Sequence, residues 1–274
     1  MQRSSFHKLM KSRRALALPV TYLILFASLV TLISVTYSFA VVKIGERATN
    51  LKAAVAKQNM QLLDAAVQEV AWSYGASKTI YMDDCGGTFR IDTNAKFIII
   101  SITDEGGFHA SIFNSHVGKA LYDFDTTALI YEKDFVRGDP ETIANASSST
   151  TTQLYVDSHD YRHLILDYRP IISVTVAGTA NGKPLNLIRV YVINLNESQT
   201  LALFEKFHLA ISSLSVSRTS SQWEFNESIA SLSIAASIDQ SSGTVHVPIS
   251  STAEGAVVNV EVVLCSIKIQ EPEV

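Results

Sequence analysis

The sequence is poor in charge and in the residues that interrupt regular structure. Its 274 residues include only six Pro and 12 Gly, and 18% are charged while 47% are hydrophobic. This composition argues against disorder, which requires low hydrophobicity and high charge. The sequence also lacks the GxSxG, Walker A, GxGxxG and HExxH motifs that mark common enzyme classes. We therefore expect a packed protein that is not an enzyme and holds no cofactor.

Positive charge is scarce beyond residue 14. Lys and Arg number 22 against 26 Asp and Glu, and five of the basic residues lie in residues 1–14, where there is no acid. The rest of the chain therefore has 17 basic and 26 acidic residues, a net charge of −9. Because nucleic-acid binding depends on Lys and Arg that neutralise phosphates, we exclude nucleic acid as a partner.

Cysteine is also rare, with only Cys85 and Cys265. Neither belongs to a CxxC pair or lies beside closely spaced histidines, so no zinc site is predicted. In an extracellular domain the two could form a disulfide, closing a loop of about 180 residues that is worth roughly 4–5 kcal/mol in chain-entropy models. The alternative is two separate buried thiols, since a free Cys behaves as a small apolar residue.

A long apolar segment follows the basic N-terminus. Ala15 to Val42 are 28 residues without a charge, whereas about 20 are enough to cross a bilayer. Only Lys43 and Arg47 follow closely, opposed by Glu46. The positive-inside rule then predicts a single-pass membrane protein, with residues 1–14 in the cytoplasm and residues 76–274 at the cell surface. A cleaved signal peptide is the alternative, because Ser38-Phe39-Ala40 resembles a signal-peptidase site, but its apolar core is usually only about 7–15 residues.

The helix is expected to continue past the apolar segment. Residues 43–74 contain no Pro and one Gly, and they place apolar side chains near helical spacing. These are Ile44, Leu51, Val55, Leu62, Ala66 and Val70. We predict one helix from Ala15 to Tyr74, about 90 Å long at ~1.5 Å per residue, with a stop at Gly75. Residues 15–75 thus form a long helix, of which 15–42 spans the membrane in the precursor.

The N-terminal region resembles the class III signal peptides of archaeal type IV pilin-like proteins. The resemblance covers residues 1–75 and is carried by the basic leader ending in Arg13-Arg14, by Ala15, and by the apolar helix that becomes amphipathic. It implies that a prepilin peptidase cuts between Arg14 and Ala15, and that the helix then packs against copies of itself in a filament. Bacterial pilins usually have Glu at the fifth mature position, which is Pro19 here, whereas archaeal members commonly lack it.

The resemblance implies a structural or adhesive subunit of a type IV pilus-like surface filament or pseudopilus. The partners it implies are the membrane, the peptidase and further copies of the chain. The alternative is a permanently membrane-anchored extracellular binding protein that does not assemble. The two differ in whether the leader of residues 1–14 is removed.

Beyond Gly75, short β-branched runs alternate with turn residues, which predicts a β-sandwich-like antiparallel head domain and an α+β protein overall. Turn sequences predict three hairpins, around 104–107, around Asn181-Gly182 and at 241–243. The apolar phase of the last strand inverts near Leu264, which predicts a β-bulge there. Leu201 to Leu214 is predicted to be strand and not helix.

The head domain has three further polar features in its sequence. Arg137 to Thr152 is rich in Ser and Thr and has no apolar rhythm, so we expect an exposed loop. N-glycosylation acceptor patterns occur at Asn145, Asn196 and Asn226. A third group, in the sequence VDSHDYRHLILDY, shares one strand parity: Asp157, His159, His163 and Asp167. Because the histidines would lie about 13 Å apart on a strand, we expect a solvated strand face and not a metal site.

Overall fold

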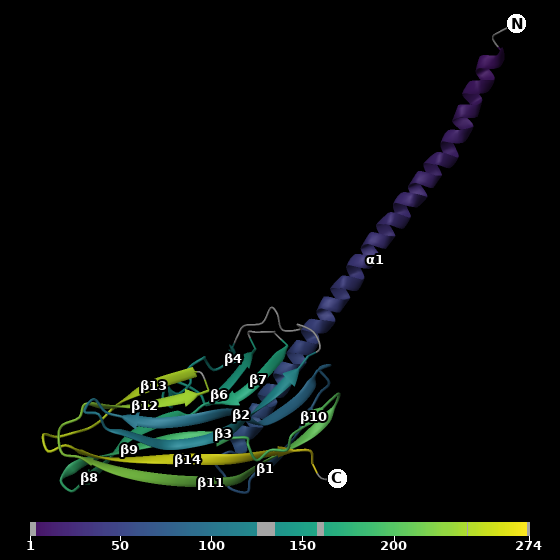
Figure 1. Cartoon of the computed structure of the whole chain (residues 1–274). Helices are drawn as coiled ribbons and strands as arrows, with labels where there is room; N and C mark the ends of the chain where they lie inside the picture. Colours follow the sequence, from purple (N-terminus) through teal and green to yellow (C-terminus); the bar gives the residue numbers. More distant parts are fainter. Residues whose placement is uncertain (1–3, 125–134, 158–161, 240, 273–274) are drawn as a thin grey trace. The chain divides into compact units, whose positions relative to one another are not determined.

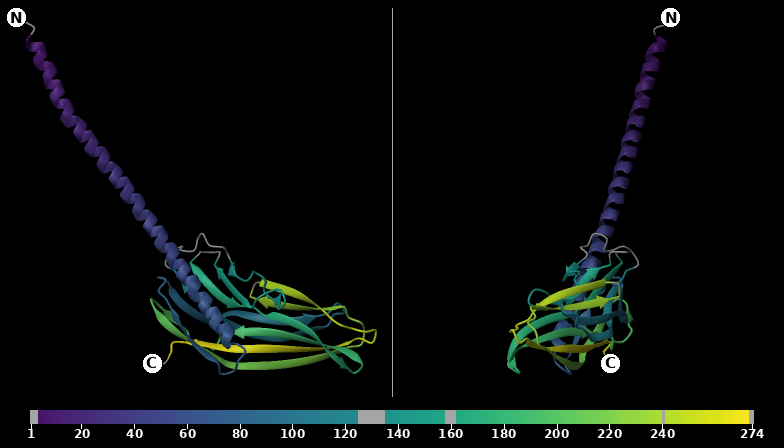
Figure 2. Two further views of the ribbon diagram at one scale, coloured as in Figure 1. Left: turned by 180° about the vertical axis from the view of Figure 1, so that it is seen from behind. Right: turned by 60° about the vertical axis from the view of Figure 1, so that its left-hand side comes forward.

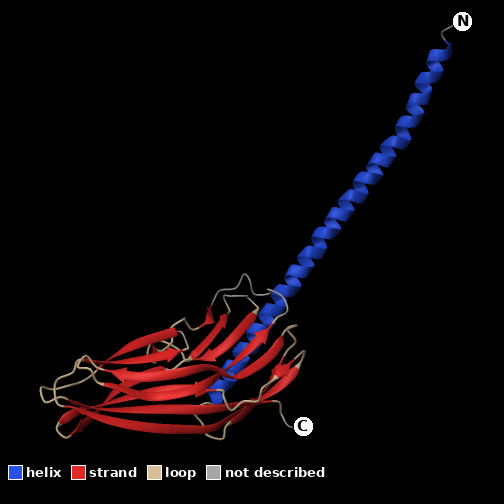
Figure 3. Cartoon of the chain, viewed as in Figure 1, coloured by secondary structure: helices blue, strands red, loops and turns tan. Residues whose placement is uncertain are grey.

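A computed structural model of the chain describes residues 4–124, 135–157, 162–239 and 241–272, with side chains from residue 19 onward. One long N-terminal helix is followed by a mostly β domain, which confirms the α+β class (Figure 3). The chain divides into two compact units, Met1–Leu51 and Lys52–Val274. We call them the N-terminal unit and the head unit. The helix, α1 (Ser4–Val70), contributes to both.

The strands of the head unit follow α1 in chain order and are labelled in Figure 1. They are β1 (Ser77–Met82), β2 (Thr88–Thr103), β3 (His109–Asp123), β4 (Phe135–Arg137), β5 (Ala144–Asn145), β6 (Thr152–Val156), β7 (His163–Tyr168), β8 (Ile171–Ala180), β9 (Lys183–Asn194), β10 (Ala202–Leu203), β11 (Phe207–Phe225), β12 (Ser231–Ile238), β13 (Ser241–Pro248) and β14 (Ala256–Gln270).

These strands form two sheets. One has the order β1-β11-β14-β9-β8-β5, and the other has the order β13-β12-β2-β3-β7-β6-β4 with β10 beside β2. Most neighbours are antiparallel, as predicted, but β14 runs parallel to β9 and β5 runs parallel to β8. The parallel pairs bring together segments far apart in the sequence, and local turn chemistry carries no information about them.

Two of the three predicted hairpins form at their predicted turns. β2 and β3 pair around residues 104–108, and β8 and β9 pair around Asn181-Gly182. Asn181 has φ 55° and Gly182 has φ 78°, the left-handed pair that a tight two-residue hairpin requires. The third hairpin, between β12 and β13, forms with its turn after Ile238, so residues 241–243 belong to β13 and the predicted turn position was wrong. Asp239, with φ 49°, supplies the left-handed residue instead.

The last turns of α1 form the centre of one hydrophobic core, which we call the helix core. Side chains of α1 enter it at alternating spacings of three and four residues, the period of one helix face. They are Ala53, Ala56, Met60, Leu63, Val67 and Val70, all at most 3% exposed. Of the apolar residues that predicted this part of the helix, Ala66 and Val70 lie in the helix core, whereas Leu62 is 40% exposed and Leu51 is 67% exposed. Figure 2 shows these turns lying against strands of both sheets.

A second core, the sheet core, contains side chains of both sheets and, among the described residues, none from α1. β14 passes from one core to the other. Val258, Val260 and Val262 lie in the sheet core, whereas Cys265 and Ile267 lie in the helix core. The alternation of apolar residues along β14 therefore inverts because the strand leaves the sheet core and enters the helix core. The β11–β14 ladder has a register shift close to the predicted position, but it falls between Ser213 and Ser215 of β11, opposite Ile267 and Ser266. The bulge predicted near Leu264 therefore lies on the partner strand and not on β14. Leu201 to Leu214 is strand where it is regular, as predicted.

The helix ends slightly earlier than predicted. Val70 is the last residue of α1, and a turn leads to Gly75, whose φ of +76° is the left-handed conformation expected at a helix stop. The Ala71 carbonyl, one of the groups left without a partner at a helix end, accepts hydrogen bonds from Ser213 Oγ (3.3 Å) and from Cys265 Sγ. The end of the helix is thus tied to β11 and β14.

Candidate functional site: the N-terminal helix and its contacts

Within the N-terminal unit, α1 is apolar enough to cross a membrane. Pro19–Val70 is a candidate span near the N-terminus, and its most apolar window has none of its residues buried within the chain. Large apolar side chains are exposed from Val20 to Val42, including Tyr22 at 68%, Phe26 at 68% and Leu29 at 55%. A water-exposed helix of this kind would be strongly unfavourable, because each large side chain gains about 1.5–3 kcal/mol on burial. The segment therefore requires an apolar environment from outside the chain.

Four hydroxyl side chains between Val20 and Val42 are satisfied within the helix. Ser28 Oγ donates to the carbonyl of Leu25, and Thr31, Ser34 and Thr36 each donate to the carbonyl four residues earlier, all at 2.8 Å. Such back-bonding means that these four hydroxyl protons do not need water as an acceptor. The surface of the segment is therefore compatible with lipid and equally with neighbouring apolar helices.

The predicted processing residues lie in the first part of α1. Arg13, Arg14 and Ala15 have helical backbone, and their side chains lie outside the described part of the chain. The first charges after the apolar segment are Lys43 and Glu46, which form an exposed ion pair at 2.7 Å. The uncharged segment is thus bounded on both sides, as the sequence predicts.

In the head unit, α1 is attached through a buried polar network centred on Asp64. This carboxylate is 1% exposed, and it accepts hydrogen bonds from Arg137 Nη1 (2.6 Å), Thr152 Oγ1 (2.7 Å) and Tyr168 OH (3.3 Å). Burial raises the pKa of Tyr168 well above its ordinary value, with the neighbouring Asp64 charge adding to the effect, so the phenol stays protonated and donates. A buried carboxylate is tolerated only when it is paired in this way.

Two further polar side chains of α1 bond to the strands and loops around them. Asn59 Nδ2 donates to the Asp83 carbonyl (2.7 Å) and to Tyr122 OH (3.0 Å). Gln68 Nε2 donates to Thr151 Oγ1 at 2.8 Å. With Asp64, these contacts fix the rotation of the helix within the head unit, which apolar packing alone specifies less strictly.

The polar tract from Arg137 to Thr152 is only partly the exposed loop that was predicted. It is irregular apart from the ends of β4 and β6 and the short β5, but Ile143 and Ala144 are at most 2% exposed. Its anchor is Arg169, which is fully buried. A buried guanidinium must have its donors satisfied, and this requirement draws the loop inward.

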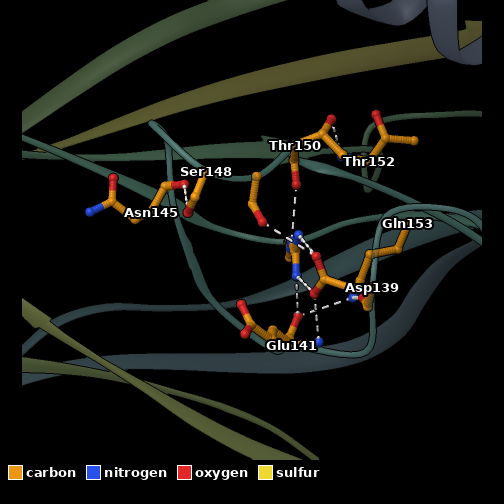
Figure 4. A network of polar contacts seen from close by, with 9 residues as sticks. Asp139, Glu141, Asn145, Ser148, Thr150, Thr152 and Gln153 are labelled. Carbon is orange, nitrogen blue, oxygen red and sulfur yellow. Dashed lines mark hydrogen bonds and ion pairs between the residues drawn. The ribbon is translucent and has the colours of Figure 1, made fainter.

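Arg169 binds the loop at three points. Its Nη2 donates to Asp139 Oδ2 (2.7 Å) and its Nη1 to Oδ1 of the same carboxylate, while Nη1 also donates to the Glu141 carbonyl (2.9 Å) and Nε to the Thr150 carbonyl (3.0 Å). Figure 4 shows Asp139, Glu141, Thr150 and Gln153 converging on this network. The hydrogen bonds from Arg169 lower the pKa of Asp139 to about 2. Both charged residues of the sequence Arg137-Gly138-Asp139 are therefore paired within the chain, Arg137 with Asp64 and Asp139 with Arg169.

The two cysteines are separate thiols. Both are buried and free, so of the two alternatives the structure has the unbonded one. Burial raises the pKa of Cys85, whose side chain lies beside Tyr122, and raises that of Cys265 to about 11. Cys265 contributes to the end of α1 through its bond to the Ala71 carbonyl.

The three glycosylation patterns differ in accessibility. Asn226 is exposed, whereas Asn145 and Asn196 are half-buried. Asn145 Oδ1 accepts hydrogen bonds from the N–H (3.0 Å) and the Oγ (2.9 Å) of Ser147, which closes the local turn of its pattern. Asn226 Oδ1 accepts a bond from Lys183 Nζ at 2.7 Å.

The group Asp157, His159, His163 and Asp167 does not form one solvated strand face, so that expectation was wrong. His163 begins β7 and Asp157 follows β6, while Asp167 is 2% exposed and paired with Lys96. His159 lies outside the described residues. Within the described part of the chain, no three His, Cys, Asp or Glu side chains are grouped as metal ligands.

No protein-family model, no curated protein and no solved structure matches this chain. What the chain does is therefore inferred from its own residues.

Two residues that organise the head unit around α1, Asp64 and Arg169, were not predicted from the sequence. Asp64 carried a usable signal, because it is a lone acid beside Leu63 and Ala66 on the buried face of the helix. Arg169 carried none, since its partners come from a tract without periodicity.

Proposed function

We propose that this chain is a structural or adhesive subunit of a type IV pilus-like surface filament or pseudopilus. The N-terminus lies in the cytoplasm and a β-sandwich-like, glycosylated head lies outside the cell. A prepilin peptidase removes residues 1–14 between Arg14 and Ala15. The apolar part of α1 then leaves the lipid and packs against the same segment of sister copies.

The observation that carries this proposal is the surface of α1 from Pro19 to Val42. Its apolar side chains are exposed, and four of its hydroxyl side chains, those of Ser28, Thr31, Ser34 and Thr36, bond to carbonyls of the same helix. A helix with such a surface can leave the lipid and pack against sister helices with little loss of free energy from its polar groups. Removal of the basic leader takes away the charges that hold the segment across the membrane.

A permanently anchored surface binding protein is the second candidate. The same apolar surface favours it, because the segment is long enough to remain in a bilayer. The two functions differ in the final location of the apolar helix, which lies in the filament in the first and stays in the membrane in the second.

Mechanical shearing of cells that express the chain separates the two. A filament subunit is released with its apolar helix, so peptides covering residues 15–42 appear in the sheared fraction. An anchored protein leaves these peptides in the membrane fraction. Recovery of the head without residues 15–42 in the sheared material would contradict both.

A further inference from the structure

We propose that a cleft at the edge of the sheet core binds a basic peptide segment through its Arg or Lys side chains. The cleft has a volume of about 660 Å³, within the range of ligand pockets. It lies between the β2–β3 turn and the connection from β11 to β12, and it contains no residue of α1. The proposal does not rest on filament assembly.

Three half-buried aromatic rings form the apolar wall of the cleft. Phe108 packs edge-on against Trp223, with ring centroids 5.4 Å apart, and against Phe225, with centroids 5.5 Å apart. All three pack at the border of the sheet core and line the cleft. Their π faces carry partial negative charge, so an ammonium or guanidinium group placed over them is attracted.

The polar rim of the cleft is acidic. It is lined by Asp104, Glu105, Glu224 and Glu227, and no Lys, Arg or His lines it. The carboxylates of Glu105 and Glu227 make no hydrogen bond or ion pair with any described residue, whereas Glu224 is paired with Lys183 at 2.8 Å. Two carboxylates thus remain available beside the aromatic wall. The wall and the acidic rim therefore both favour a positively charged ligand.

The walls are held in place before any ligand binds. Lys183, whose side chain is 10% exposed, donates to the Phe225 carbonyl at 3.2 Å and to Asn226 Oδ1 at 2.7 Å. A Cβ at Gly255 would lie 1.9 Å from the Phe225 carbonyl oxygen, so only glycine permits the close approach of that loop. On the opposite wall, Asp104 Oδ1 accepts the Phe108 N–H at 2.7 Å. A preorganised cleft loses less entropy when it binds a peptide.

The test uses the full chain in detergent micelles and isothermal titration calorimetry with three probes, hexaarginine, hexaglutamate and the neutral oligosaccharide maltohexaose. We expect hexaarginine to bind and the other two not to bind. Binding should weaken as salt is raised from 50 to 300 mM, because the carboxylates are exposed to solvent.

Two variants locate the binding. Glu105→Gln/Glu227→Gln should weaken hexaarginine binding by roughly fivefold, since each exposed ion pair contributes modestly. Trp223→Leu keeps an apolar side chain against Phe108 but removes the π face, and we expect a loss of about tenfold. The matched control is Glu197→Gln/Glu271→Gln, which removes the same charge from exposed positions elsewhere and should leave binding unchanged.

The proposal is overturned if hexaarginine does not bind, or if the control pair weakens binding as much as the cleft pair does. Preferential binding of maltohexaose that is lost in Trp223→Leu would also overturn it and identify a carbohydrate site. None of these outcomes depends on whether residues 1–14 are cleaved, so failure here is distinguishable from failure of the filament proposal.

Discussion

Asp64, buried on α1, lies 2.6 Å from the half-exposed guanidinium of Arg137 at the end of β4. This pair connects α1 to the polar tract of residues 137–152, and Arg169 binds the same tract at Asp139 and Thr150. The attachment of α1 in the head unit therefore depends on a chain of charged contacts as well as on apolar packing. Such contacts can be removed one at a time without emptying the core.

The Arg137→Gln variant should destabilise the head unit by about 1–2 kcal/mol, because it leaves the buried Asp64 carboxylate without its cation. In an Asp64→Asn background the same change should cost much less. Urea unfolding of the full chain in micelles measures both differences. Arg218→Gln, on an exposed part of β11, is the control and should change stability by less than about 0.5 kcal/mol. Equal costs in the two backgrounds would show that Asp64 and Arg137 are not coupled.

The lowered pKa of Asp139 predicts that the folded head unit loses stability in acid. Its pKa is lowered to about 2 by hydrogen bonds from Arg169, whereas an unfolded aspartate has a pKa of about 3.9. The unfolded chain therefore takes up this proton at higher pH than the folded chain does. The stabilisation is complete above about pH 5 and is lost as the pH falls toward 2.

Thermal unfolding of the wild type and of Asp139→Asn at steps from pH 6 to pH 2 tests this prediction. The variant lacks the titrating group, so the difference in melting temperature should be largest at pH 6 and should shrink below pH 4. A difference that stays constant down to pH 2 would rule out the Arg169 pairing as its source.

The thiols of Cys85 and Cys265 are predicted to be unreactive in the native protein and free after denaturation. Both are buried, and a pKa of about 11 leaves Cys265 protonated at pH 8. Iodoacetamide at pH 8 should add no groups to the native chain within minutes and two groups after unfolding without reductant. Intact mass measurement gives the count, and no uptake by the unfolded chain would reveal a disulfide.

Leu29 and Leu51 form a matched pair for testing the apolar segment, since both are exposed on α1, at 55% and 67%. Leu29→Lys puts a charge near the middle of the uncharged run and should reduce membrane insertion, at a cost of roughly 3 kcal/mol. Leu51→Lys lies beyond the run and should insert normally. Carbonate extraction of membranes reports the inserted fraction, and equal extraction of the two variants would argue against residues 15–42 as the span.

The sequence predicted those features that depend on neighbouring residues. The apolar run, the β-rich head and the turns at 104–107 and Asn181-Gly182 follow from local composition and from φ requirements. The β12–β13 turn was misplaced because Ser241-Ser242-Gly243 resembles a turn, while Asp239 also accepts a left-handed φ of 49°. Polar turn residues tolerate more than one register.

Features that depend on distant partners could not be predicted in this way. Arg137 to Thr152 has a loop-like composition, yet Arg169 binds it inside the head unit, and only the fold brings the two together. The inversion in β14 suggested a local bulge, whereas the strand changes from one core to another. The parallel pairing of β9 with β14 leaves no local mark on either strand.

We propose that the chain is processed between Arg14 and Ala15 and then assembles through α1. N-terminal mass spectrometry of the protein purified from its native cells tests this most directly, with an Arg14 substitution that the peptidase rejects as the comparison. We predict a mature N-terminus at Ala15, and loss of both this terminus and surface assembly in the Arg14 variant. A chain that begins at Met1 or Gln2 would contradict processing and favour the permanent anchor, and a chain that begins at Val41 would instead identify a cleaved signal peptide.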